Sequence, residues 1–234
     1  MSADICTGIL DCAHWDADDH PDLGASLAQA VAADGIVLVI AKITQGRDYV
    51  DPTWKRWVDA CRQCNVKLGA YHFMSNTEAG ELETEWFLAQ IAASGLDPKT
   101  MPLASDFERN PKPGETASVP QAEAFVQRVH DKVGFWPLLY GDPSFHHQIT
   151  NPKSVLVNCP LWPAEYGSSL AHGGPPVPPA FKAAGKTWTI WQYTDGIYSA
   201  TDLPKLVTGF PRMDRSVYRG SSAELLAALP ALGG

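Results

Sequence analysis

Residues 102–108 read PLASDFE, a short apolar run that ends in two carboxylates, Asp106 and Glu108. The apolar start is typical of a buried β-strand, and residues two apart on a strand project from the same face. The two carboxylates therefore point to one side, with Cα atoms roughly 6.6 Å apart. Further apolar runs of this kind predict strands at residues 6–11, 36–44, 67–73, 136–140, 155–162, 187–193 and 210–214.

Amphipathic stretches separate most of these runs and predict helices at residues 23–33, 53–65, 77–94 and 119–133, with a weaker helix after Pro143. Strands that alternate with helices indicate a parallel sheet, and eight strands in about 215 residues favour a closed barrel. Helical patterns thin out after the fifth strand. The predicted fold class is therefore α/β, an irregular TIM-like barrel over residues 1–220. Residues 221–234 are expected to form a C-terminal helix and tail that packs on the barrel or trails from it.

The composition is that of an ordinary globular protein, with 234 residues and 18 Lys and Arg against 26 Asp and Glu. The resulting net charge of −8 argues against nucleic acid or an anionic membrane as a partner. No apolar run approaches the roughly 20 residues of a membrane-spanning helix. The first residues, MSADICTGIL, lack the basic and apolar regions of a signal peptide. The five cysteines, an odd number, are expected to be free thiols made in a reducing compartment.

Polar and aromatic side chains collect where the predicted strands end. In a parallel barrel these ends meet at one rim, which is where active sites lie. Glycoside hydrolysis requires paired carboxylates, because one donates a proton to the leaving oxygen and the other holds charge near the anomeric carbon. Aromatic faces suit the C–H faces of sugars. The candidate site residues are Asp11, Trp15, Lys42, Tyr71, Asp106, Glu108, Tyr140, Trp162, Gln192, Tyr193 and Asp214.

Other sequence patterns do not indicate a metal site, a redox site or another class of enzyme. Cys61 and Cys64 lie inside a helical pattern without a second ligand pair, so zinc or redox use is not expected. The acidic segment 16–20, DADDH, is interpreted as a turn before Pro21 rather than as a metal loop. The sequence has no phosphate-binding loop, dinucleotide motif or serine-hydrolase elbow. We therefore expect neither a metal nor an organic cofactor.

Several segments, taken in order along the chain, resemble glycoside hydrolase family 25, the lysozyme-like N-acetylmuramidases. The resemblance covers about residues 8–220, and it departs from the family at Ala13, at Ser105 and in the closing segment 214–216, which lacks the usual Leu-Asn. The matching segments are DCAHW at 11–15, AKITQG at 41–46, YVDP at 49–52, GAYHF at 69–73, PLASDFE at 102–108, PLLY at 137–140, LWPA at 161–164, WQYT at 191–194, MD at 213–214 and YRG at 218–220.

The resemblance implies a barrel of eight strands with about five helices and an acidic site built on Asp11, Asp106, Glu108 and Asp214. It implies cleavage of the β-1,4 bond between N-acetylmuramic acid and N-acetylglucosamine in peptidoglycan glycan strands. Glu108 would be the general acid, and Asp106 would stabilise positive charge on the ring or on the substrate's acetamido group. The three other carboxylates and the aromatic walls are expected to raise the pKa of Glu108. Backbone or Tyr donors are expected to keep Asp106 ionised.

Two other functions stay open on the sequence alone. One is hydrolysis of another amino-sugar polymer such as chitin, and the other is glycan binding without catalysis. We expect a monomer that is made in the cytoplasm and reaches the cell wall after lysis or by dedicated export. The sequence does not choose between a phage lysin and an exported effector.

Overall fold

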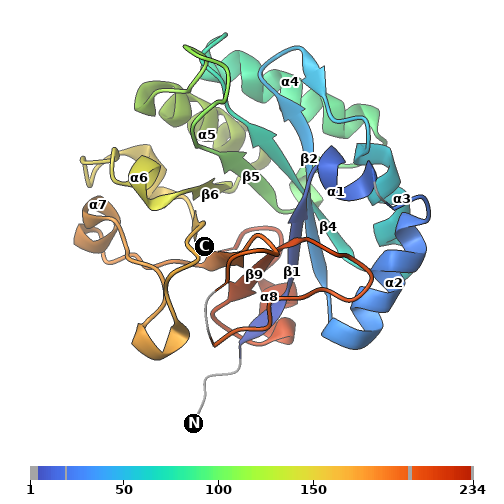
Figure 1. The fold of residues 1–234 in the computed structure, drawn as a ribbon. Helices are drawn as coiled ribbons and strands as arrows, with labels where there is room; N and C mark the ends of the chain where they lie inside the picture. The colour runs from blue at the N-terminus through green and yellow to red at the C-terminus, as the bar shows by residue number, and fades with distance from the viewer. Residues whose placement is uncertain (1–4, 19, 200–201, 233–234) are drawn as a thin grey trace.

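The computed structural model describes residues 5–18, 20–199 and 202–232, and these fold into a nearly closed barrel (Figure 1). The sheet runs in the order β7, β6, β5, β4, β2, β1, β9, β8, with β3 paired to β2 outside this path. Parallel bridges from Leu161 to Trp188 and from Ala164 to Gln192 join its two edges. The predicted irregular TIM-like barrel is confirmed. The strands are β1 (Cys6–Cys12), β2 (Leu38–Gln45), β3 (Tyr49–Val50), β4 (Lys67–Phe73), β5 (Leu103–Asp106), β6 (Leu138–Gly141), β7 (Leu161–Pro163), β8 (Ile190–Thr194) and β9 (Asp214–Tyr218).

Local capping signals set the ends of the helices. Asp22 accepts a hydrogen bond from the Ala25 backbone N–H at the start of α2, and Ser118 forms a capping box with Gln121 at the start of α5. Long helices cover the barrel beside β1 to β5, whereas only short helices accompany β6 to β8 (Figure 1). The helices are α1 (His14–Asp18), α2 (Leu23–Asp34), α3 (Trp54–Cys64), α4 (Gly80–Ala93), α5 (Val119–Val133), α6 (Pro143–His146), α7 (Pro179–Ala183) and α8 (Ser222–Ala228).

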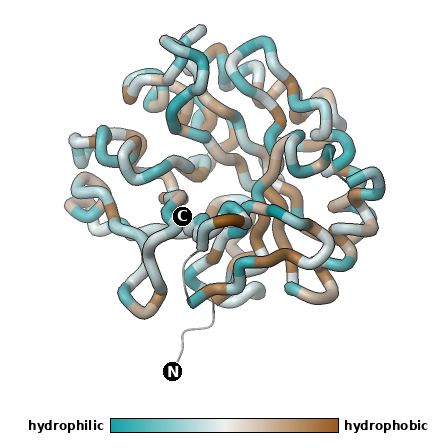
Figure 2. The backbone as a smooth tube through the Cα atoms, viewed as in Figure 1, coloured by the Kyte–Doolittle hydropathy of each residue, from teal (hydrophilic) through white to brown (hydrophobic). Residues whose placement is uncertain are grey.

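The apolar side chains form two layers, one between the strands and the helices and one inside the barrel. The strands accordingly form the most hydrophobic part of the backbone trace (Figure 2). Leu225 of α8 and the later Leu232 are buried in the inner layer with Cys6, Ile9 and Leu38, so the C-terminal segment closes the barrel end opposite the strands' carboxyl ends. Residues 233–234 of the predicted tail lie outside the described residues.

Two predicted strands are placed differently by the structure. The run 155–162 begins as a 3-10 helix at Val155–Asn158, because the Ser154 side chain accepts the Leu156 N–H, and only Leu161–Pro163 forms β7. The eighth strand is Asp214–Tyr218 rather than 210–214, and it runs antiparallel to both neighbours. Asp214 therefore begins its strand instead of ending it. The reversal brings Asp214 to the same rim, directly opposite Asp11.

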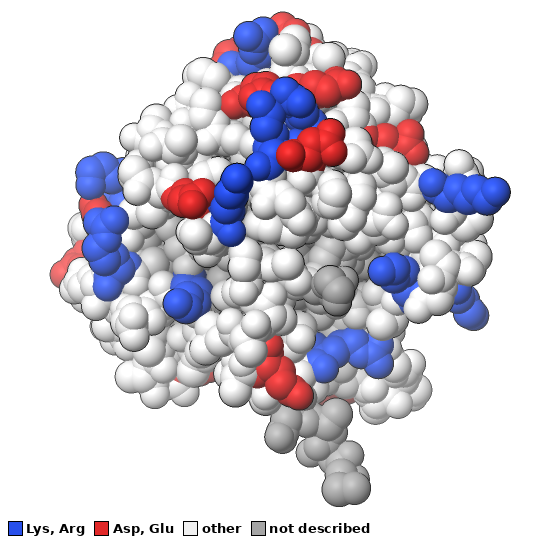
Figure 3. Space-filling model, turned by 180° about the vertical axis from the view of Figure 1, so that it is seen from behind, with Lys and Arg blue, Asp and Glu red and all other residues white. Residues whose placement is uncertain are grey.

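On the outer surface, acidic and basic side chains lie interspersed over the face turned away from the view of Figure 1 (Figure 3). One set of surface ion pairs joins Glu85 of α4 to cations of α5, at 3.0 Å from Lys132 Nζ and 2.5 Å from Arg128. No patch of a single sign dominates the described part of that face. Within residues 5–18, 20–199 and 202–232, no helix is both long and apolar enough to cross a membrane.

Candidate active site

The four predicted carboxyl groups converge in one chamber at the carboxyl ends of the strands. The chamber has a volume of about 110 Å³ and opens into a cleft of about 1530 Å³. Tyr71, Asp106, Glu108 and Asp214 line both spaces, so the chamber is the floor of the cleft. The chamber is lined by Asp11, Tyr71, Asp106, Glu108, Tyr140, Trp162 and Asp214.

Phe107 fixes the direction of the Asp106–Glu108 pair. Its ring is fully buried on the outside of the barrel, edge-on to Phe145 at a centroid distance of 5.3 Å. Its N–H donates to the Tyr140 carbonyl oxygen at 2.9 Å and continues the strand pairing past Asp106. Because side chains alternate along an extended backbone, burying Phe107 outside turns both carboxyl groups inside.

Gly141 is required where β6 passes this segment. A Cβ atom at Gly141 would lie only 2.4 Å from the Phe107 carbonyl oxygen, which is a severe clash with backbone. The absence of a side chain at Gly141 therefore allows the close approach of β6 to the backbone of Phe107.

Gln192 holds three other side chains of the site together. Its Nε2 donates to Asp11 Oδ1 at 2.6 Å. Its Oε1 accepts hydrogen bonds from the hydroxyls of Tyr140 at 3.0 Å and Tyr166 at 2.7 Å. Gln192 is fully buried and does not line the chamber. Gln192 thus lies behind the chamber and bonds to the side chains of Asp11 and Tyr140 that line it.

Burial and mutual repulsion favour the neutral forms of these acids. Burial, with Asp16 and Glu108 nearby, raises the pKa of Asp11 to about 8, against the hydrogen bond from Gln192. The pKa of Asp214 is raised well above its ordinary value by burial and by Asp11. Burial and then the charge of Glu108 raise the pKa of Asp106 well above its ordinary value. Burial raises the pKa of Glu108 to about 7.

The expected donors to Asp106 are not present among the described residues. Asp106 is 5% exposed, and its Oδ1 is buried without a hydrogen-bond partner there. Asp11 Oδ2 is a second buried carboxyl oxygen of this kind. Because buried polar atoms are nearly always paired, two unpaired acceptors in one chamber indicate a place for a ligand's donors.

Most of the predicted aromatic residues lie in or beside this site. Tyr140 and Trp162 pack edge-to-face at 4.9 Å, and Trp162 Nε1 donates to Ser216 Oγ at 3.0 Å. Trp15 lies in the cleft wall with 75% of its surface exposed, and its ring is tilted against that of His14 at a centroid distance of 4.0 Å.

Of the two remaining predicted site residues, Tyr193 lies outside the cleft and Lys42 lies in it. Tyr193 is fully buried, and its hydroxyl donates to the Pro204 carbonyl oxygen at 2.8 Å. It follows Gln192 in β8 and so faces away from the barrel interior, which places it outside the site. Lys42 does line the cleft, where its Nζ donates to Gln45 Oε1 at 2.8 Å and lies 4.8 Å from the Phe73 ring centroid. Burial lowers the pKa of Lys42, against the attraction of Asp106.

Asp16 is a cleft residue that the sequence analysis missed. It lies in the first turn of α1, lines the cleft, and accepts a hydrogen bond from the Ala13 N–H at 2.8 Å. Its charge contributes to the raised pKa of Asp11 and of Asp214. The only signal in the sequence is an acid shortly after Asp11, and the turn predicted for segment 16–20 instead begins within α1. Asp19 of that segment lies outside the described residues.

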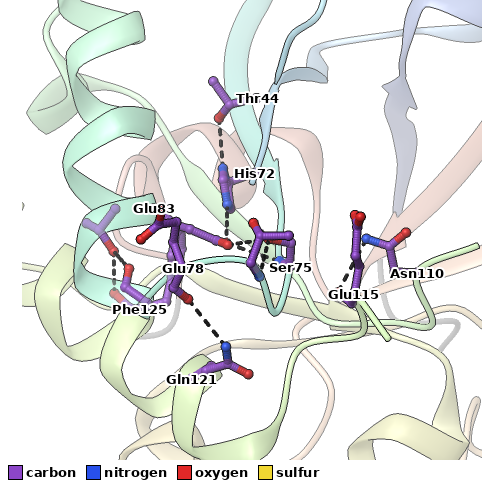
Figure 4. A network of polar contacts seen from close by, with 12 residues as sticks. Thr44, His72, Ser75, Glu78, Glu83, Asn110, Glu115, Gln121 and Phe125 are labelled. Atoms are coloured by element: carbon purple, nitrogen blue, oxygen red, sulfur yellow. Dashed lines mark hydrogen bonds and ion pairs between the residues drawn. The ribbon is translucent and has the colours of Figure 1, made fainter. Parts of the chain in front are cut away.

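A buried polar network supports the cleft wall from behind (Figure 4). The His72 ring lies 2.8 Å from Thr44 Oγ1 through Nδ1 and 2.9 Å from Glu83 Oε2 through Nε2. Glu83 also accepts the Ser75 N–H at 3.0 Å and the Ser75 hydroxyl. Burial lowers the pKa of His72, against the pull of Glu83. Ser75 lines the cleft, so this network ties the loop after β4 to α4.

Metal ligands and disulfides do not feature in the described part of the chain. No group of three or more His, Cys, Asp or Glu side chains there could hold a metal ion. All five cysteines are free, and Cys61 is buried with a pKa raised to about 12 by burial.

Paired carboxylates at the carboxyl-terminal rim of a barrel are the arrangement that glycoside hydrolysis requires. Residues 10–201 match the model of the family described as glycosyl hydrolases family 25. The chain belongs to this family.

Individual relatives show how far the similarity extends. The chain is 31% identical over 155 residues to the autolytic lysozyme of Clostridium acetobutylicum, a match that covers 65% of this chain and 45% of that protein. It is 27% identical over 196 residues to the N,O-diacetylmuramidase of Chalaropsis, covering 75% of this chain and 90% of that protein. A match to the uncharacterized protein YegX of Escherichia coli covers 55% of that protein. The chain thus spans about half the length of the first curated relatives it matches.

Among solved structures, the bacterial lysozyme from Streptomyces coelicolor aligns with a TM-score of 0.73 at 23% sequence identity, covering 100% of both chains. The muramidase from Acremonium alcalophilum aligns with a TM-score of 0.67 at 23% identity, covering 93% of this chain and 96% of that one. At this level of identity the alignments establish a shared fold.

Proposed function

We propose that the protein is a muramidase that hydrolyses the β-1,4 bond between N-acetylmuramic acid and N-acetylglucosamine in peptidoglycan. The observation that carries this proposal is the convergence of Asp11, Asp106, Glu108 and Asp214 on one chamber in the floor of a long cleft. The cleft, at about 1530 Å³, exceeds the roughly 300–1,000 Å³ of a small-molecule pocket and suits several sugars of a glycan strand.

Glu108 is the proposed general acid. With a pKa raised to about 7, it keeps its proton through the acid range and up to neutrality. It lies where the chamber opens into the cleft, so a glycosidic oxygen lying along the cleft floor can reach it. A proton on this oxygen makes the leaving sugar a neutral alcohol, which is the task of the acid in glycoside hydrolysis.

Asp106 is the proposed stabiliser of positive charge. Its unpaired Oδ1 can accept a hydrogen bond from the acetamido N–H of the sugar, or face positive charge as it develops on the ring. Either partner favours the ionised form of Asp106. Substrate binding would therefore separate the roles of the pair, with Asp106 losing its proton while Glu108 keeps one.

The remaining site residues serve this pair. Asp11 is held through Gln192 and presents a free Oδ2 to the chamber, where it can bind a sugar hydroxyl or a water. Tyr140 and Trp162 provide an aromatic wall. The names of the relatives support the substrate, since one is an autolytic lysozyme and the modular autolysin LytC of Streptococcus pneumoniae has been solved in complex with synthetic peptidoglycan ligand.

The test is mass spectrometry of peptidoglycan digests after borohydride reduction. Muramitol at the new ends is expected, and glucosaminitol would show cleavage of the other glycosidic bond. Chitin oligosaccharides, digested in parallel, test the rival amino-sugar polymer. A zymogram tests glycan binding without catalysis, because a binding protein leaves no cleared band.

Variants of the pair test the assignment of roles. Glu108→Gln keeps the shape of the side chain and removes the proton, so we expect a loss of about 10²–10⁴ in rate. Asp106→Asn is expected to lose activity strongly as well, because charge stabilisation in a buried site is a large effect. Near-normal turnover by Glu108→Gln would remove Glu108 from the role of acid.

A further inference from the structure

Asp142 is an acid beside the chamber that has no role in the reaction as described so far. It follows β6 directly, and its backbone stays extended at φ −71° and ψ 160°. Tyr140, two residues earlier, lines the chamber. Because residues two apart share a face, Asp142 leaves β6 toward the same side.

The strand register brings Asp142 alongside Glu108. Parallel pairing aligns Asp106 with Tyr140, and the Phe107 N–H extends that pairing with its bond to Tyr140. Continued by two residues on both chains, this register aligns Glu108 with Asp142 at the spacing of paired strands, roughly 4.8 Å, and the Asp142 charge is close enough to raise the pKa of Glu108. The glycine at 141, where any Cβ would strike the Phe107 carbonyl, keeps the two chains close at this point.

The Asp142 carboxylate is fixed in place. Its Oδ1 accepts the backbone N–H groups of Ser144 at 2.6 Å and Phe145 at 3.3 Å, in the first turn of α6. Phe145 in turn packs on Phe107, the residue between Asp106 and Glu108 in the sequence. Asp142, α6 and the Asp106–Glu108 segment therefore form one packed unit.

The other site acids around Glu108 do not supply a negative charge like that of Asp142. Burial raises the pKa of Asp11, Asp106 and Asp214, so these acids favour their neutral forms in the free protein. Lys42 acts in the opposite sense and lowers the pKa of Glu108. The remaining titratable groups near Glu108 or Asp142 are Tyr71, Tyr140, Tyr166, Arg109, His146 and His147.

His146 leaves the charge of Asp142 uncompensated. It follows in the same helix and is fully buried, with both ring nitrogens unpartnered among the described residues. Burial lowers the pKa of His146 to about 4, so its ring is neutral near pH 7. After burial, Asp142 is the first cause of the raised pKa of Glu108, ahead of the three acids that the sequence analysis expected.

We propose that Asp142 is a positioning residue for the reaction, a fixed negative charge that keeps the proton on Glu108 up to neutral pH. This inference rests on the proposed role of Glu108 as the acid. The site then has five acidic side chains with a role in the reaction. One of them, Asp142, touches neither the substrate nor the reacting atoms.

The test is the pH profile of kcat/KM on soluble peptidoglycan fragments. Asp142→Asn removes the charge and keeps the cap, since Asn and Asp cap helices equally well. We expect the basic limb to move down by about one pH unit, the order of effect of one nearby charge in a partly buried site. The rate should stay unchanged near pH 5 and fall by about tenfold above the shifted limb. Asp142→Glu should restore the limb.

Asp97→Asn is the matched control, because Asp97 also caps a turn through the Lys99 N–H but precedes β5, at the opposite end of the barrel. Its profile should match that of the wild type. An unmoved limb in Asp142→Asn, or an equal loss of rate at every pH, would overturn the inference. Asp142→Ser, an uncharged cap, repeats the test if the Asn variant folds poorly. An active Glu108→Gln would instead overturn the proposed function, so the two failures are distinguishable.

Discussion

Replacing Glu108 with Gln is expected to stabilise the folded protein at alkaline pH while it removes the proposed activity. Burial and the charge of Asp142 raise the pKa of Glu108 from 4.5 to about 7. An acid with a raised pKa binds its proton more tightly in the folded state than in the unfolded chain. Its contribution to stability is complete below the unfolded value and is lost as the pH rises through the folded value.

The size of the effect follows from that difference. Between 4.5 and about 7, each pH unit corresponds to about 1.4 kcal/mol, which sums to about 3 kcal/mol lost by pH 8.5. Glu108 is partly exposed to the cleft, so solvent reduces this to about 2 kcal/mol. Gln has the same shape and carries no charge. The variant should therefore be about 2 kcal/mol more stable than the wild type at pH 8.5 and nearly equal to it at pH 4.

Urea unfolding followed by Trp fluorescence at pH 4 and pH 8.5 measures both differences. Glu81→Gln provides the control, because Glu81 is an exposed acid on α4, and its substitution should change stability little at either pH. If Glu108→Gln changed the free energy of unfolding equally at the two pH values, Glu108 would not be a carboxyl group held neutral by the fold.

Four further predictions concern other parts of the site. Gly141→Ala places a Cβ 2.4 Å from the Phe107 carbonyl oxygen, so we expect a loss of about 1–3 kcal/mol in urea unfolding and a fall in turnover. Gln192→Leu removes the donor to Asp11 and the acceptor of two tyrosines, which should lower the free energy of unfolding by about 2–4 kcal/mol and abolish turnover. Trp15→Ala, at an exposed position, should raise KM about fivefold with an unchanged melting temperature. Exhaustive chelation should leave the rate unchanged, and a loss that zinc restores would contradict this.

The barrel and its acidic pair were predictable from the sequence, because both depend on local patterns. Apolar runs followed by polar residues predicted six of the eight barrel strands near their observed places, and amphipathic stretches predicted the long helices. The alternation of residues 106–108 in an extended chain turns Asp106 and Glu108 together, whatever the rest of the fold does. Residues that meet through one strand or one helix turn carry their geometry in the sequence.

Contacts between distant segments needed the tertiary structure. The direction of β9, which makes Asp214 the first residue of its strand, depends on pairing with β1 and β8. Gln192 and Tyr193 are adjacent in the sequence, yet their roles diverge because only the packed barrel decides which face is inside. The proximity of Asp16 and Asp142 to the site follows from the packing of α1 against the barrel and from the pairing of β6 with β5. The sequence predicted a raised pKa for Glu108 but not the charge that raises it, because the place of Asp142 beside Glu108 depends on long-range packing.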